Sequence, residues 1–249
     1  MAFNTEWLFG RQAVREMLRA RRRRVQRILL AKGSQRTGIM AEIITLAQGV
    51  RCPVGEGDRQ ALDQVSANAN HQGVVAEVSA YPYETMEAIL AAAGDEAPLL
   101  LGLDHVQDPQ NLGALLRSAD AAGVHGVVLP ERRAAGITAA VSNASAGAVE
   151  HLRIAQVVNL TRTLQELKAQ RLWVAGLEVD PQAIPFDEAN LTGPLILVVG
   201  SEGQGLSRLV RETCDWLISL PMLGHVESLN VAVAGSIVLY AARSARRRS

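Results

Sequence analysis

A cluster of polar residues stands next to the last apolar stretch of this chain. Residues 220–231 read LPMLGHVESLNV and precede a long run with almost no charge. Pro221 and Gly224 favour a tight turn in which the backbone can approach a ligand closely. We expect Ser228 to cap the following helix, whose first N–H groups, together with the Asn230 amide, would offer hydrogen bonds to a polar ligand. The stretch therefore predicts a binding site, and the alternative is a tight turn before a packed helix.

A second group of polar residues lies on an apolar segment that has the spacing of a helix. Arg117 stands among leucines and alanines, and Asn111 precedes it by six positions, less than two turns, so the two need not share a face. An arginine in such a helix is costly unless its guanidinium has an anionic partner. Two partners fit the sequence equally well: a carboxylate such as Glu202, which would make a structural ion pair, or a substrate phosphate.

A glycine-rich loop, residues 200–206, follows the apolar run LILVV late in the chain. It lacks the Lys-Ser/Thr pair of a phosphate loop, and the residues after the first buried-type strand of the same region, 104–113, lack the G-x-G-x-x-G of dinucleotide-binding sheets. A site formed by late strands is therefore favoured over a nucleotide site at the start. The five histidines have no metal-ligand spacing, and residues 143–147 only loosely resemble a nucleophile elbow, so neither a metal site nor a hydrolase is predicted.

The first eighty residues must form a small α/β unit. Helix and strand patterns alternate there, with helices expected at 11–20, 38–47 and 60–65, strands at 25–30 and 73–78, and a short strand or turn at 52–55. Residues 81–97 contain a short helix between proline- and alanine-rich stretches and are expected to form a linker.

The chain from Leu99 onward has a regular α/β alternation. Strands are expected at 99–103, 127–129, 152–157, 172–177, 195–199 and 216–220, with a helix at 112–122 and helices between most of the others. That order predicts a largely parallel sheet covered on both faces. The last helix has small residues beside Ile237, Val238 and Leu239 and is apolar nearly all round, so we expect it to be buried both in the fold and in a homodimer interface.

Charge is unevenly distributed along the 249 residues. Residues 1–80 carry 12 basic and 7 acidic side chains, net +5, and the remainder carries 13 and 18, net −5. A basic first third indicates a polyanionic partner, although a solvated basic helix would look the same. The arginines expected to contact the phosphates of such a partner are Arg19, Arg21, Arg22, Arg23 and Arg24.

Cysteine content and hydropathy limit the compartment of the protein. Cys52 and Cys214 are far apart in sequence and form no C-x-x-C, so no disulfide framework is expected. No segment has the pattern of a signal peptide or the length of a membrane span. We therefore expect a cytoplasmic protein with no membrane partner.

Three stretches, in order, resemble the motifs of the SpoU/TrmH family of RNA ribose 2′-O-methyltransferases, of the SPOUT superfamily. They are PQNLGALLRSA (109–119), VVGSEGQGL (198–206) and LPMLGHVESLNV (220–231), and the similarity extends over about 99–243. The resemblance implies a SPOUT methyltransferase domain with a deep trefoil knot at 98–249. The sequences FGRQAV (9–14) and HQGV (71–74) resemble the family's ribosomal-protein-like α/β RNA-binding domain, which implies such a domain at 1–80 and a linker at 81–97.

The resemblance also implies a cofactor, an assembly and roles for individual residues. S-adenosyl-L-methionine would bind in the knot, and a homodimer would build each active site from both subunits. The implied catalytic residues are Asn111, Arg117, Glu202, Ser228 and Asn230. The implied cofactor-binding residues are Gly176, Leu177, Gly200, Leu220, Met222 and Leu229. Because a guanidinium is hard to deprotonate, we expect Arg117 to hold the phosphate beside the reacting ribose and to stabilise the forming alkoxide.

The expected reaction is S-adenosylmethionine-dependent 2′-O-methylation of a ribose in structured RNA, with a guanosine of 23S ribosomal RNA as the leading target. Methylation of tRNA or of another ribosomal RNA nucleotide is the alternative within the same class. An RNA-binding or ribosome-assembly factor without activity is the alternative from a different class, and the complete set of polar residues argues against it.

Overall fold

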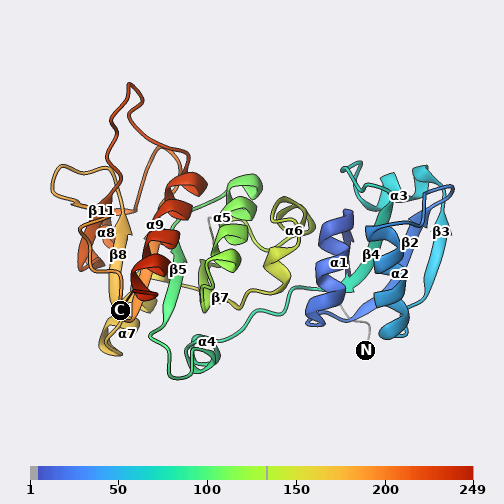
Figure 1. Cartoon of the computed structure of the whole chain (residues 1–249), viewed down its shortest axis with the longest axis horizontal. Coiled ribbons are helices and arrows are strands. Elements are labelled where there is room, and N and C mark those ends of the chain that lie inside the picture. The colour runs from blue at the N-terminus through green and yellow to red at the C-terminus, as the bar shows by residue number, and fades with distance from the viewer. Residues whose placement is uncertain (1–4, 133, 249) are drawn as a thin grey trace. The chain divides into compact units, whose positions relative to one another are not determined.

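The computed structural model describes residues 5–132 and 134–248 of the chain. Within these ranges the contacts divide the chain into two compact units (Figure 1). The amino-terminal unit contains the chain up to Pro82 together with Ile137–His151, and the carboxy-terminal unit contains Tyr83–Gly136 and the chain from Leu152 onward.

The amino-terminal unit is built on a four-stranded sheet of order β1-β4-β2-β3. Strand β4 pairs antiparallel with both β1 and β2, and β2 pairs parallel with β3. The predicted helices and strands are present, with the addition of β1, whose Leu8 is fully buried. The elements are β1 (Thr5–Phe9), α1 (Arg11–Ala20), β2 (Val25–Ala31), α2 (Ile39–Gly49), β3 (Val54–Gly57), α3 (Arg59–Val65), β4 (Val74–Ser79), α6 (Ala139–Ala144) and the 3-10 turn η1 (Ala148–Glu150).

Residues 137–151 pack on the amino-terminal unit, which differs from the predicted boundaries, because the sequence placed them in the domain at 98–249. A buried ion pair is the physical reason: Arg23 Nε lies 2.8 Å from Glu150 Oε2, and the two side chains are 0% and 1% exposed. A buried arginine requires such a partner. Asn143 adds a second link, donating from Nδ2 to the Phe9 carbonyl at 3.1 Å.

The carboxy-terminal unit is built on a seven-stranded sheet of order β7-β6-β5-β10-β8-β11-β9, in which every pair is parallel. The prediction of a largely parallel sheet is confirmed. The elements are α4 (Met86–Ala92), β5 (Leu99–Leu103), α5 (Pro109–Ala121), β6 (Gly126–Pro130), β7 (Ile154–Val157), α7 (Leu160–Ala169), β8 (Trp173–Leu177), β9 (Ile184–Pro185), β10 (Leu195–Val199), α8 (Arg208–Thr213), β11 (Trp216–Ser219) and α9 (Val231–Arg246).

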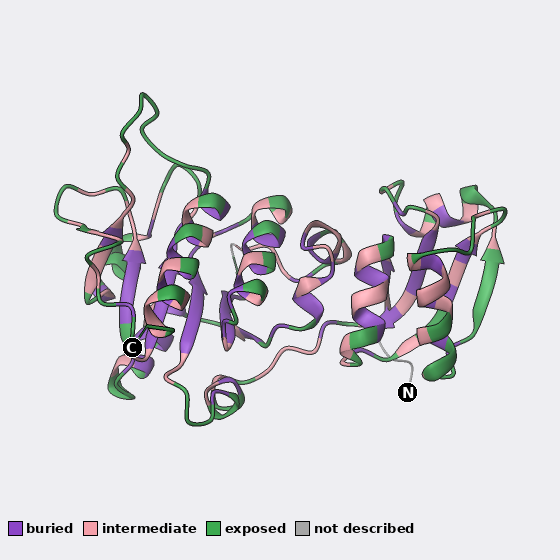
Figure 2. Cartoon of the chain, viewed as in Figure 1, coloured by how far each residue is buried: buried purple, intermediate pink, exposed green. Residues whose placement is uncertain are grey.

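Helices cover both faces of this sheet because its strands are apolar on both sides. Leu100 and Ile196 point to a core shared with α4, α7 and α8. On the other face α5 and α9 lie side by side, and Gly235 of α9 lets the helix approach Leu115 and Val199, because a Cβ there would be 2.8 Å from the Leu115 side chain. Figure 2 shows the buried strands between helices whose outer sides are exposed.

The segment 81–97, expected to be a linker, contributes to the core of the carboxy-terminal unit. Ile89 of α4 is fully buried in the cluster that α7 and α8 cover. The apolar spacing of the short helix already indicated a packed segment, because a solvated linker does not need an apolar face.

The described residues contain neither a membrane-spanning helix nor a cluster of metal ligands. No helix there is both long and apolar enough to cross a membrane. No three His, Cys, Asp or Glu side chains in that part of the chain come together as a group that could hold a metal ion.

Candidate functional site

Two adjoining cavities lie at the carboxyl ends of the central strands of the parallel sheet, where open α/β sheets bind ligands. The first, which we name the glycine-loop cavity, has a volume of about 360 Å³. Three segments line it: residues 177–179 after β8, residues 199–205 after β10, and positions between 220 and 234 around the start of α9. The sequence motifs indicated the second and third segments, the family resemblance indicated Leu177 of the first, and the fold brings all three together.

The glycine loop is closed by backbone hydrogen bonds. Ser201 N donates to Gly205 O at 3.1 Å and Gly205 N donates to Ser201 O at 3.0 Å. A Cβ on Gly200 would lie 2.2 Å from the Gly205 backbone, so only glycine permits this turn. The backbone itself therefore forms one wall of the cavity.

Glu178 is a polar residue of this cavity that the sequence analysis did not identify. Its Oε2 accepts a hydrogen bond from Leu206 N at 2.9 Å, which fixes the carboxylate beside the glycine loop. Its Oε1 has no hydrogen-bond partner among the described residues. The available signal was its position directly after a buried parallel strand, the edge at which such sheets place functional side chains.

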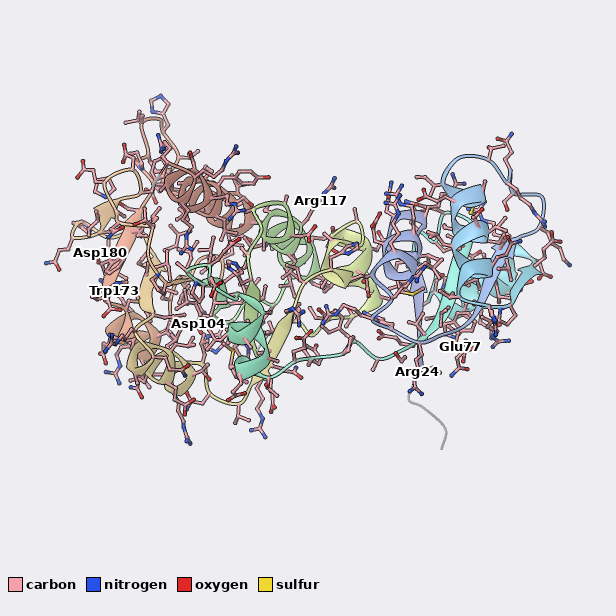
Figure 3. The ribbon with its side chains drawn as sticks, turned by 60° about the horizontal axis from the view of Figure 1, so that its bottom comes forward. Arg24, Glu77, Asp104, Arg117, Trp173 and Asp180 are labelled. Carbon is pink, nitrogen blue, oxygen red and sulfur yellow. The ribbon has the colours of Figure 1, made fainter. Side chains whose placement is uncertain are left out.

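The second cavity, which we name the Asn111 cavity, also has a volume of about 360 Å³ and shares Ser201, Glu202, Gln204 and Val231 with the first. The turn after β5 supplies its other wall. Asp104 there is buried, accepts a hydrogen bond from Ser207 N at 2.6 Å, and lies 3.0 Å from His105 Nδ1 through its second oxygen (Figure 3). His105 also lines this cavity, although no sequence motif pointed to a role for it.

A line of three hydrogen-bonded side chains includes Glu202, which lines both cavities, and Asn111, which lines the Asn111 cavity. Asn230 donates from Nδ2 to Asn111 Oδ1 at 2.8 Å, and Asn111 donates from Nδ2 to Glu202 Oε2 at 2.9 Å. The three residues come from three separate motifs, so the fold joins positions up to 119 residues apart. We name this arrangement the Asn-Asn-Glu line; it holds three of the five candidate catalytic side chains in fixed relative positions.

The first turn of each flanking helix helps to fix this line. Asp108 caps α5 and accepts from Asn111 N at 3.0 Å. Asn230 caps α9, because its Oδ1 accepts from Ala232 N at 2.9 Å and from Val233 N at 3.3 Å. The prediction that Ser228 caps this helix is therefore wrong: α9 begins at Val231, two positions too late for Ser228 to reach its free N–H groups. Ser228 is exposed and lines the glycine-loop cavity instead.

Arg117 is separate from these residues in the single chain. It lies on the exposed side of α5 and has neither an ion pair nor a hydrogen bond among the described residues. Figure 3 shows its side chain extending from α5 away from the ribbon. The ion pair with Glu202, one of the two possibilities from the sequence, is not formed, since Glu202 accepts from Asn111. A charged group on the exposed face of a helix is available to a partner outside this chain.

The predicted cofactor-binding residues divide into two groups. Leu177, Gly200, Leu220, Met222 and Leu229 all line the glycine-loop cavity. Gly176 does not: it is buried in β8, and a Cβ there would approach Leu206, Cys214 and Leu217 within 3.0 Å. Close packing between β8 and its neighbours accounts for this glycine.

Cys214 packs against Gly176 of the same strand, and its thiol is unreactive. Burial raises the pKa of its thiol to about 12, and the nearby Asp215 carboxylate acts in the same direction. The thiol is therefore protonated at neutral pH and does not serve as a nucleophile.

The predicted RNA-contacting arginines have different environments. The prediction that Arg23 contacts RNA is wrong, because its side chain is fully buried between Glu150 and Glu6 and cannot reach a phosphate. Arg19 pairs with Glu16 and Glu42, and Arg22 donates to the Tyr81 hydroxyl at 3.3 Å. Arg21 and Arg24 are exposed.

Two family models match the chain. The model of the SpoU rRNA Methylase family matches residues 98–240, and the model described as RNA 2′-O ribose methyltransferase substrate binding matches residues 7–84. The two matches coincide with the motif-bearing region and with most of the amino-terminal unit.

The chain is similar to several proteins along nearly its whole length. It is 42% identical over 244 residues to the putative TrmH family tRNA/rRNA methyltransferase YacO of Bacillus subtilis, covering 96% of each chain. It is 45% identical over 239 residues to the 23S rRNA (guanosine-2′-O-)-methyltransferase RlmB of Pseudomonas aeruginosa, covering 94% of each. The fold matches that of the SpoU methyltransferase AviRb from Streptomyces viridochromogenes in complex with AdoMet, with a TM-score of 0.81 and 24% identity over 98% of this chain and 92% of that one.

Proposed function

The chain belongs to the SpoU rRNA methylase family, and we propose that the ribose it methylates is that of a guanosine in 23S ribosomal RNA. It is an RNA 2′-O-methyltransferase that uses S-adenosylmethionine. Similarity over 94% of both chains to a protein named for the 23S rRNA guanosine reaction supports the finer target. The Asn-Asn-Glu line supports the catalytic part of the proposal, because its two hydrogen bonds are formed and its Glu202 lines both cavities.

The glycine-loop cavity fits the cofactor. The glycine loop offers backbone groups without side chains, Leu220 and Leu229 offer apolar surface, and the Oε1 oxygen of Glu178 can accept a hydrogen bond. A mainly apolar pocket with a few placed polar groups is what an adenosine-containing ligand requires. When bound there, S-adenosylmethionine would supply a sulfonium methyl group, whose carbon a ribose 2′-oxygen can attack while the sulfur leaves as a thioether.

The Asn111 cavity is the place for the RNA nucleotide. It adjoins the glycine-loop cavity through Ser201, Glu202 and Gln204, so groups held in the two cavities share one wall. The Asn-Asn-Glu line orients the nucleotide at that wall and keeps the glycine loop in place. Holding the nucleophile in a fixed direction contributes to rate because the reacting groups no longer have to find one another in solution.

Arg117 completes the site from a second copy of the chain. It is exposed on α5 and has no partner among the described residues. Beside it α9 exposes Val233, Ile237 and Tyr240, which are 49%, 37% and 52% exposed and lie on one face at spacings of four and three. An exposed apolar face of this kind supports a homodimer through α5 and α9. In the dimer Arg117 holds the phosphate beside the ribose reacting in the partner subunit and stabilises the developing negative charge on oxygen.

The carboxy-terminal segment forms the trefoil knot, a reading supported by the way the residues around 220–231 join two loops from other strands around one cavity. The protein acts in the cytoplasm, where its ribosomal RNA substrate is found.

Methyl incorporation tests the function. We expect transfer of labelled methyl groups from S-adenosylmethionine to a 23S rRNA transcript, at the 2′-oxygen of one guanosine, and no transfer to a tRNA transcript. Transfer to tRNA alone would contradict the 23S target, and transfer to neither RNA would favour a binding factor. Light scattering at micromolar concentration should give the mass of a dimer, and a monomer mass would contradict the shared site.

A further inference from the structure

The amino-terminal unit contains a cavity that the methyl-transfer reaction does not use. We name it the N-terminal cavity; its volume is about 510 Å³, within the range of ligand sites. It lies where β1, β2 and β3 end and β4 begins, at the start of α1. Its lining consists of Arg11, Ala31, Arg59, Asp63, Asn68, Ala69, Asn70, His71, Gln72 and Gly73.

Two arginines give this cavity a positive charge. Arg59 is exposed and has no ionic or hydrogen-bonding partner among the described residues, and Arg11 has no carboxylate partner there. Asp63 is the acidic residue of the lining, and its Oδ1 lies 3.0 Å from His71 Nε2. Most other arginines of the unit differ, because Glu6, Glu16, Glu42, Glu56, Glu77 and Glu150 pair with them.

The wall between α3 and β4, residues 66–73, is held in one conformation. Ala67, Asn68 and Gln72 have positive φ angles of 52°, 60° and 53°. Non-glycine residues rarely adopt this region, and such strain persists where surrounding contacts impose it, often at ligand sites. Asn68 N donates to Asp63 O at 2.8 Å, which is one of those contacts.

The same wall is tied to the start of α1. Arg11 donates from Nε to Gln72 O at 2.9 Å, and its backbone N donates to Gln72 Oε1 at 3.1 Å. His71, 5% exposed, accepts from Gly73 N at 3.0 Å and so braces the end of the loop. The Arg11 guanidinium is thereby fixed with its two terminal NH₂ groups still available as donors.

We propose that the N-terminal cavity binds a single-stranded segment of the RNA substrate, with Arg11 and Arg59 on backbone phosphates and the amides of Asn68 and Asn70 on a base edge. Neither amide side chain has a hydrogen-bonding partner among the described residues. Guanidinium groups suit phosphate, and an amide can both donate to and accept from a base. A preformed loop loses little entropy when it binds. The proposal rests on the RNA methyltransferase activity but not on the 23S target.

This site lies at the end of the sheet opposite to the arginine cluster expected from the sequence. Strand β2 starts next to Arg24 and ends at Ala31, which lines the cavity, and its seven residues span about 20 Å. Figure 3 shows Arg24 beside Glu77, near the far end of β4. Substitutions at the two locations should therefore have different effects on RNA binding.

Binding of the full-length protein to a 23S rRNA transcript and to a tRNA transcript, each measured over a range of salt concentrations, tests the assignment. We expect the double variant Arg11→Ala/Arg59→Ala to bind its substrate RNA on the order of tenfold more weakly. The slope of log affinity against log salt should become shallower by about 1.4, since each single-stranded phosphate contact contributes about 0.7. Affinity for S-adenosylmethionine should not change.

Matched variants keep the test specific. Arg59→Ala alone should show about half of the change in slope, and it removes no contact within the protein, so a folding defect does not explain it. Arg51 is an exposed arginine before β3, at the other end of the sheet, and no described residue pairs with it. The Arg51→Ala variant should therefore bind RNA normally.

Two results would overturn the proposal: unchanged RNA binding by the double variant, or a loss confined to Arg21→Ala/Arg24→Ala. Methyl transfer to tRNA alone would instead contradict the 23S target and leave the assignment of this cavity to be decided by the tRNA-binding data.

Discussion

Replacing Asn230 separates its two roles in the site. Its Oδ1 caps α9 and its Nδ2 donates to Asn111. Asn230→Ala removes both contacts. Asn230→Ser keeps a side chain that caps well but cannot extend to Asn111. The two variants therefore share the loss of the Asn-Asn-Glu line and differ in the loss of the cap.

The expected magnitudes follow from these contacts. Loss of an N-cap costs about 1 kcal/mol in the free energy of unfolding, and loss of a partly exposed hydrogen bond costs about 1 kcal/mol more. For a chain of this size, 1 kcal/mol lowers the melting temperature by about 2–4 °C. Asn230→Ala should then melt about 4–8 °C lower, and Asn230→Ser about half as much. In both, single-turnover methyl transfer should fall on the order of a hundredfold, because small displacements of oriented groups are that costly.

Calorimetry and single-turnover kinetics on the same preparations distinguish stability from catalysis. We expect two variants of unequal stability and equally low methyl-transfer rate. A folded Asn230→Ser protein that transfers methyl groups at the wild-type rate would refute the role of the Asn-Asn-Glu line, and equal melting temperatures for the two variants would refute the capping role.

Arg23→Ala should destabilise the amino-terminal unit by about 3–5 kcal/mol, seen as a lower melting temperature, because Glu150 is left buried and unpaired. Gly200→Ala should raise the dissociation constant for S-adenosylmethionine about tenfold or more in calorimetric titration, since the new Cβ would clash with the Gly205 backbone and distort the cavity wall. Cys214 should resist alkylation in the native protein at pH 8, where a thiol of pKa about 12 is thiolate in about one molecule in ten thousand, and should react after denaturation.

Controls for these variants come from exposed positions. Arg21→Ala, in the same run of arginines, should leave the melting temperature nearly unchanged, because Arg21 has no ionic partner among the described residues. Gly224→Ala should bind the cofactor normally, since nothing lies within 4 Å of its added Cβ. Loss of stability in the first or of cofactor affinity in the second would show that the effects are not specific.

Local pattern determined much of this protein from the sequence alone. Continuous apolar runs such as Leu99–Leu103 and Leu195–Val199 predicted buried parallel strands, because a strand covered on both faces needs no polar side. Three motifs in order indicated the family and therefore the reaction and cofactor. Their placement after late strands predicted where the cavities would form, since parallel strands end at one edge of a sheet.

Tertiary structure decided what each polar residue does, because burial and partners depend on residues distant in sequence. Arg22, Arg23 and Arg24 look alike in the sequence. Only the structure shows that Arg23 is buried against Glu150, which is 127 positions away in the sequence. Because of that contact, residues 137–151 belong to the amino-terminal unit. No local sequence pattern predicts this assignment. Composition could not distinguish a paired arginine from an unpaired one, so it favoured the cluster at 19–24 over Arg11 and Arg59. Pairing across the fold occupies Arg19 and Arg23 of that cluster, and it leaves Arg11 and Arg59 without a carboxylate partner among the described residues.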